Sequence, residues 1–148
     1  MSKNFNQNFG LSLGKNKINI KKKYQENFFL KLYYKTIKKT GPKNIFYVDE
    51  NISSLNLASQ AFKNLVKKNK NINKKKIKNL IFVTETNKYN FPGNSFLLGS
   101  QLNLNPETKL FDLNAGCTGF VDAIDFANNL KGNSLIVCAE TYSKHIRK

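Results

Sequence analysis

The sequence predicts an α/β fold in which helices pack on the faces of a mostly parallel mixed sheet. Three apolar, strand-like segments at 79–84, 109–114 and 134–139 alternate with segments of helical periodicity. Strands that alternate with helices indicate crossover connections, which join parallel strands. A length of 148 residues suits one domain with a hydrophobic core, so we expect a single domain over 1–148.

The first helix of this region is expected to begin at Ser53 or Ser54, whose hydroxyl groups can cap a helix start. Its apolar residues recur at spacings near 3.6: Leu55, Ala58, Phe62, Leu65 and Val66. The lysine-rich stretch 67–76 that follows is too polar to be buried. We therefore expect it to be an exposed connection.

The strand at 79–84 is expected to be buried on both faces, because its apolar run is continuous. Phe91-Pro92-Gly93 interrupts the chain before a short helix over 94–102, and the strand at 109–114 follows. The next helix is expected to bury one apolar face, made by Phe120, Val121, Ile124, Ala127 and Leu130. The strand at 134–139 contains Cys138, for which we expect a place in the core.

The first 50 residues are less regular. The pattern predicts strands over 9–13 and 45–48, with a turn at Gly41-Pro42. A helix is one interpretation of the aromatic segment 24–36.

The charge is strongly positive, +16 at pH 7, and Arg147 is the only arginine among the 25 basic residues. A basic protein can bind a polyanion, and nucleic-acid binding is one alternative function. Arginine, the usual bidentate ligand of phosphate and guanine, is almost absent, however. Lys, Asn and Ile all have AT-rich codons, so a genomic bias also explains the composition. A nucleic-acid partner is therefore the least favoured interpretation.

No segment resembles a secretory signal or a membrane span. Cys117 and Cys138 are 21 positions apart (138 minus 117), which fits neither a pair of metal ligands nor a disulfide framework. We expect a cytoplasmic protein with no metal site and no membrane association.

Cys117 lies where the strand at 109–114 ends and the next helix begins, between Gly116 and Thr118. A helix N-terminus presents free N–H groups and a partial positive charge, which stabilise a thiolate and lower the pKa of its thiol. This position favours a nucleophilic cysteine. The spacing alone is equally compatible with a buried structural cysteine.

Residues 112–124, with the sequence DLNAGCTGFVDAI, resemble the nucleophile motif of the beta-ketoacyl-acyl-carrier-protein synthase III family, which has a thiolase-like fold. Five other segments agree with the family in order and spacing: Thr40-Gly41, Asn51–Leu55, Leu80–Thr84, Phe91–Gly93 and Leu135–Thr141. The resemblance runs from about Thr36 to the end, whereas residues 1–35 match poorly. It implies the N-terminal half of a thiolase-like condensing enzyme.

The resemblance implies an acyltransferase of fatty-acid biosynthesis that holds no permanent cofactor. Cys117 would take an acyl group from acyl-CoA and pass it to malonyl-acyl-carrier protein with loss of carbon dioxide. Lys39 matches a position that contacts coenzyme A phosphates. Phe91 matches a loop residue that reaches the acyl tunnel of the partner in a homodimer. Acyl carrier proteins are acidic, and a lysine-rich surface can steer them.

Two departures from the family bear on activity. The family places a Trp against the adenine of coenzyme A, whereas this sequence has no Trp, and we hypothesise that Tyr33 or Tyr34 stacks instead. The family also uses a His and an Asn from its second half, and we assign no role to His145. Condensation is therefore expected to need a complementing C-terminal half. The alternative is a catalytically inactive remnant that binds a homologue or an acyl carrier protein.

Overall fold

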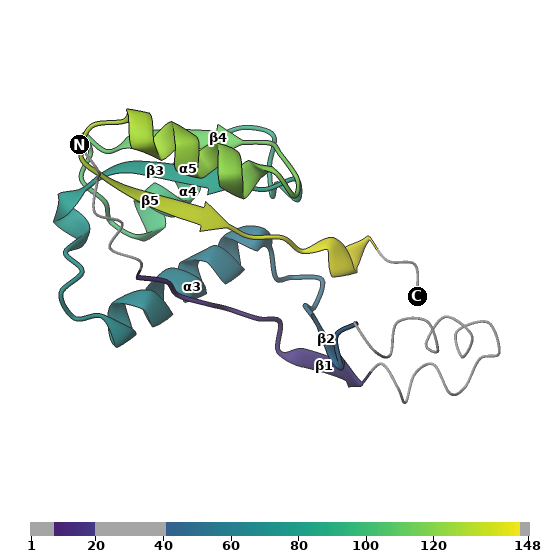
Figure 1. The fold of residues 1–148 in the computed structure, drawn as a ribbon. Coiled ribbons are helices and arrows are strands. Elements are labelled where there is room, and N and C mark those ends of the chain that lie inside the picture. The colour runs from purple at the N-terminus through teal and green to yellow at the C-terminus, as the bar shows by residue number, and fades with distance from the viewer. Residues whose placement is uncertain (1–7, 20–40, 146–148) are drawn as a thin grey trace.

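Residues 8–19 and 41–145 are described in the computed structural model of the chain (Figure 1). The centre is a three-stranded parallel sheet in the order β4-β3-β5. Its strands are β3 (Ile77–Val83), β4 (Lys109–Leu113) and β5 (Asn133–Cys138). In the register of the sheet, Phe82 lies opposite Asp112 on one side and Val137 on the other. The predicted α/β fold with a parallel sheet is confirmed.

Three α-helices cover the two faces of this sheet: α3 (Ser54–Lys68), α4 (Asn94–Gln101) and α5 (Gly119–Asn129). Figure 1 shows α5 on one face and α3 and α4 on the other. Two short 3₁₀ helices, η1 (Lys74–Lys76) and η2 (Tyr142–Lys144), precede β3 and follow β5. The helices expected from periodicity are present, and their ends agree with the prediction to within one or two residues.

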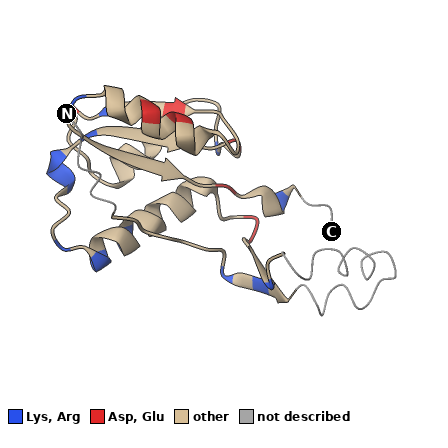
Figure 2. Ribbon diagram, in the orientation of Figure 1, with Lys and Arg blue, Asp and Glu red and all other residues tan. Residues whose placement is uncertain are grey.

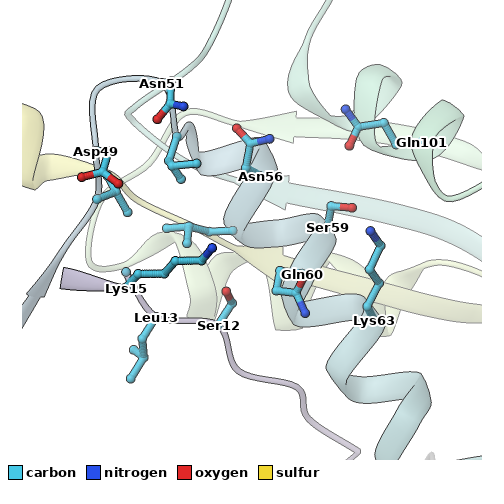
Figure 3. A pocket seen from close by; sticks show the side chains of 14 residues that line it. Ser12, Leu13, Lys15, Asp49, Asn51, Asn56, Ser59, Gln60, Lys63 and Gln101 are labelled. Atoms are coloured by element: carbon cyan, nitrogen blue, oxygen red, sulfur yellow. The ribbon is translucent and has the colours of Figure 1, made fainter. Parts of the chain in front are cut away.

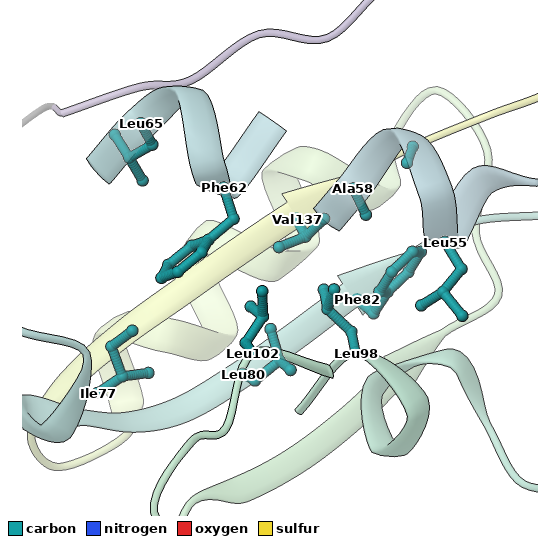
Figure 4. Close-up of a cluster of buried hydrophobic side chains, with 11 residues drawn as sticks. Leu55, Ala58, Phe62, Leu65, Ile77, Leu80, Phe82, Leu98, Leu102 and Val137 are labelled. Atoms are coloured by element: carbon teal, nitrogen blue, oxygen red, sulfur yellow. The ribbon is translucent and has the colours of Figure 1, made fainter. Parts of the chain in front are cut away.

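β3 is buried on both faces because alternate side chains enter two separate hydrophobic clusters. Leu80 and Phe82 pack with residues of α3, α4 and β5 in the larger cluster (Figure 4). Ile81 and Val83 point to the opposite face and pack with Ala123 of α5. All four side chains are at most 4% exposed, so β3 is the central element of the core.

The predicted start of α3 is confirmed at its N-cap, Ser53. The Ser53 side chain accepts a hydrogen bond from the Asn56 N–H, and the Asn56 side chain accepts one from the Ser53 N–H. Such a capping box satisfies two groups that a helix start would otherwise leave free. The lysine-rich segment after α3 is largely exposed, as expected.

The N-terminal part differs from the prediction. Residues 9–13 run alongside α3 without strand pairing, and the Asn64 side chain donates a 2.8 Å hydrogen bond to the Leu11 carbonyl. The strand lies later, at β1 (Asn16–Asn19), and pairs antiparallel with β2 (Asn44–Tyr47). β2 begins one residue before the predicted strand at 45–48. The possible helix at 24–36 lies outside the described residues.

Two burial predictions are wrong. Phe120 and Val121 are 53% and 66% exposed, because the buried side of α5 is formed by Gly119, Ala123 and the partly buried residues after them. Cys138 is exposed rather than in the core, because it ends β5, which pairs only with β3 among the described residues. No helix in residues 8–19 and 41–145 has the length and apolar character needed to cross a membrane.

Candidate active site

Cys117 lies in the short loop between β4 and α5, at the carboxyl end of the parallel sheet. Its side chain is exposed, so a reagent can reach the sulfur atom. The alternative of a buried structural cysteine does not fit this exposure. The predicted position at a strand-to-helix junction is confirmed, with Thr118 as the N-cap of α5. The catalytic role of the thiol stays a prediction.

The loop around Cys117 also contains unused hydrogen-bond donors. The Gly119 N–H donates to the Gly116 carbonyl at 3.0 Å, and the Asp122 N–H donates to the Thr118 carbonyl at 3.1 Å. The N–H groups of Cys117 and Thr118 themselves make no hydrogen bond within the described parts of the chain. Free N–H groups beside a nucleophile can bind the oxygen of an attacked carbonyl group.

Asp112 connects the strand before Cys117 to the start of α4. Its carboxylate accepts hydrogen bonds from the N–H of Ser95, at 2.9 Å, and from the hydroxyl of Ser95. A carboxylate at a helix N-terminus is also favoured by the helix dipole. A Cβ atom at Gly93 would lie only 2.2 Å from the Asp112 Oδ2 atom, so this contact requires glycine at residue 93. These bonds give Asp112 a structural role at the start of α4.

Glu140 connects the ends of β3 and β5. Its Oε1 atom accepts a 2.8 Å hydrogen bond from the N–H of Glu85, and Oε2 accepts bonds from the Thr84 hydroxyl and from both the N–H and the hydroxyl of Thr86. Thr86 is further held by the Thr141 N–H, which donates to its hydroxyl. The loop that follows β3 is therefore fixed by one carboxylate.

Glu85 lies on this fixed loop and brings a negative charge next to the cysteine loop. A Cβ atom at Gly116 would lie 3.0 Å from the Glu85 Oε1 atom and 3.3 Å from Oε2. Gly116 directly precedes Cys117 in the chain. Glu85 and Glu140 are functional candidates that sequence reasoning missed. No local pattern signals them, because their contacts join residues about 30 to 55 positions apart.

Cys138 has a different environment from Cys117. Partial burial raises the pKa of the Cys138 thiol, and the negative charge of Glu140 raises it further. Both effects disfavour the thiolate, which is the reactive form. Cys138 is therefore a poor nucleophile, although it is exposed. This agrees with a residue that takes no part in catalysis.

Of the other two predicted site residues, only Phe91 is described. Phe91 lies in the loop before α4 with 91% of its side chain exposed, so the ring makes little contact with the described part of the chain. The Phe91-Pro92 peptide bond is cis. Lys39, as well as Tyr33 and Tyr34, lies outside the described residues.

Two further surface features lie away from the cysteine loop. A hollow of about 580 Å³ lies between residues 12–15 and α3 and is lined mainly by polar side chains (Figure 3). None of its lining residues belongs to the loops around Cys117. The exposed lysines of the 67–76 segment lie before β3 and thus at the end of the sheet opposite Cys117 (Figure 2).

Comparison with known proteins finds similar sequences and structures. The chain is 32% identical over 117 residues to a Campylobacter jejuni protein named "Putative 3-oxoacyl-(acyl-carrier-protein) synthase 3". This match covers 76% of this chain and 33% of that protein. The structure of 3-oxoacyl-(acyl-carrier-protein) synthase from Burkholderia xenovorans superposes with a TM-score of 0.80 at 23% identity, over 95% of this chain and 43% of that one.

The 3-oxoacyl-(acyl-carrier-protein) synthase III of Aquifex aeolicus gives a TM-score of 0.75 at 26% identity, over 93% of this chain and 44% of that chain. No family model matches. The chain thus spans a third to less than half of the proteins that it resembles. The resemblance and the thiolase-like fold expected from the cysteine motif are confirmed over this part.

Proposed function

We propose that this chain, which resembles part of the 3-oxoacyl-acyl-carrier-protein synthase III enzymes in sequence and fold, is the cysteine-bearing part of a condensing acyltransferase. The observation that carries the proposal is the exposed thiol of Cys117 in the loop between β4 and α5. The substrates are an acyl-CoA and malonyl-acyl-carrier protein, and no permanent cofactor takes part. The reaction belongs to fatty-acid biosynthesis.

The first step is transfer of the acyl group to Cys117. The thiolate attacks the thioester carbonyl, a new carbon–sulfur bond forms, and the thiol of coenzyme A leaves after taking a proton. The attacked oxygen becomes negatively charged, and the N–H groups of Cys117 and Thr118, which donate to no described residue, are suitable donors for it. A donor of this kind contributes about 3 to 4 kcal/mol in acyl chemistry.

The second step is condensation. The malonyl group on the carrier protein loses carbon dioxide, and the resulting carbanion attacks the Cys117 thioester. The new carbon–carbon bond forms as the cysteine thiolate leaves. The family uses a His and an Asn here, and we expect a complementing C-terminal half to supply them. The chain alone is then expected to accept an acyl group without condensing it.

Substrate binding is proposed to involve Lys39 and Phe91. The Lys39 ammonium group pairs with coenzyme A phosphates, as a point charge without the bidentate geometry of Arg. The exposed Phe91 ring is free to reach the acyl site of a second subunit, which supports the proposed homodimer.

Intact-protein mass spectrometry after incubation with acetyl-CoA tests the first step. We expect the mass of one acetyl group to be added to the chain and to C138S, and to be absent from C117S. C138S is a matched control because it removes the other exposed thiol. Absence of the adduct from the unmodified chain, or its persistence in C117S, would contradict the proposal.

A second candidate is a non-catalytic chain that binds a homologue or an acyl carrier protein. The observation that favours it is an exposed apolar pair at the start of α5, where Phe120 and Val121 are 53% and 66% exposed. Alkylation with iodoacetamide separates the two candidates. Acyl-CoA protects a reactive Cys117 if the chain is an acyltransferase, whereas an inert Cys117 supports the binding function.

A further inference from the structure

The loops at the carboxyl end of the sheet carry negative charge in a protein that is otherwise strongly basic. Glu85 follows β3, and Glu140 follows β5. Neither carboxylate forms an ion pair with any residue within 8–19 or 41–145. Lys88 lies on the same loop as Glu85, but its ammonium group lies over the Tyr89 ring, 5.0 Å from the centroid. The charge of Glu85 is thus not neutralised by a paired cation in this part of the chain.

The position of Glu85 relative to Cys117 is fixed from two sides. The Glu85 N–H donates to Glu140 at 2.8 Å, and the next residue, Thr86, is held by Glu140 and by Ser54, whose hydroxyl donates to the Thr86 carbonyl at 2.8 Å. On the other side, the Glu85 carboxylate lies against Gly116, where a Cβ atom would be 3.0 Å from Oε1. The Glu85 carboxylate therefore lies beside the residue that precedes Cys117, and its loop is held by hydrogen bonds.

We propose that Glu85 is a specificity-determining residue that disfavours negatively charged acyl groups at Cys117 and favours positively charged ones. This inference rests on the proposed function, since it concerns the acyl group that Cys117 accepts. Glu85 is exposed, so its charge acts through solvent, but at low ionic strength the screening length is about 30 Å and the charge still acts on a group that approaches the sulfur atom. An acyl group that ends in a carboxylate meets repulsion, and one that carries an amine meets attraction. Glu140 is the positioning residue for this charge.

The charge preference of Cys117 is measured without any acyl substrate. The probes are two methanethiosulfonates of similar size, one with a trimethylammonium group and one with a sulfonate group, which both form a mixed disulfide with a thiol. The protein is the C138S chain, so that only Cys117 reacts. The readout is the ratio of the second-order rate constants for the cationic and anionic probes, at low ionic strength.

We expect E85Q to lower this ratio by roughly fivefold, and salt to reduce the difference between the two proteins. E85K is expected to lower it further. E107Q is the matched control, because it makes the same charge change at an exposed residue before β4, at the other end of that strand. An unchanged ratio in E85Q, or an equal fall in E107Q, would overturn the inference.

The outcome is separable from the test of the proposed function. A ratio that falls in E85Q while acetyl-CoA leaves Cys117 unmodified would refute the acyltransferase and leave the charge assignment standing. Acetylation of Cys117 with the same ratio in E85Q as in the parent would refute the role of Glu85 alone.

Discussion

Removal of the Glu140 carboxylate is expected to destabilise the fold and loosen the loop after β3. In E140A, four hydrogen bonds from Thr84, Glu85 and Thr86 are lost. Hydrogen bonds to a charged acceptor contribute about 1.5–3 kcal/mol each. Water can replace the bond at the exposed Glu85, and the Thr86 hydroxyl keeps its bond from Thr141. We therefore expect a loss of about 3 kcal/mol in the free energy of unfolding, well below the simple sum.

Urea unfolding followed by circular dichroism measures this loss. E107A is the control, since it removes an exposed carboxylate for which no side-chain hydrogen bond is present in the described structure, and it should change the free energy by at most about 0.5 kcal/mol. E140A should also lower the charge preference of Cys117, because residue 85 loses its anchor. Equal stability of E140A and E107A would refute the conclusion that the hydrogen bonds of Glu140 hold the ends of β3 and β5 together.

Three further predictions concern the core, the start of α4 and the second thiol. F82A should lower the free energy of unfolding by about 3–5 kcal/mol, because Phe82 is fully buried, whereas F82L should cost clearly less in the same urea titration. D112A should cost about 1–2 kcal/mol, because Ser95 loses its capping carboxylate, and D112N should recover part of this. Alkylation of Cys138 in C117S should require a higher pH than an ordinary thiol, since its pKa is raised. By linkage, this raised pKa stabilises the folded state below the ordinary thiol pKa of about 8.5, and the contribution is lost as pH rises through the raised value.

The elements that sequence reasoning located correctly are those with a strong pattern of their own. β3 is continuous in apolar residues and α3 repeats them at helical spacing, so local sequence was sufficient in both cases. The same applies to the cysteine loop, where a strand pattern stops and a helix pattern starts. The position of Cys117 was therefore predictable, whereas its exposure was not, because the spacing was equally compatible with a buried structural cysteine.

The failures arose where burial depends on distant parts of the chain. α5 has apolar residues on more than one side, so periodicity did not reveal that Ala123 faces β3 while Phe120 and Val121 face outward. β1 has the polar sequence NKIN and is a strand only because β2 pairs with it. The contact of Glu140 with Glu85 spans 55 positions, and no sequence pattern near either residue indicates it.

The Asp112 carboxylate links the strand before Cys117 to the helix that follows the Phe91 loop. One carboxylate both belongs to the strand that presents Cys117 and caps the helix that the Phe91 loop enters, with no room for a side chain at Gly93. A change that displaces α4 is transmitted through Asp112 to the nucleophile, and a shift of β4 is transmitted back to Phe91. The position of the Phe91 loop is thus mechanically coupled to the placement of the Cys117 thiol.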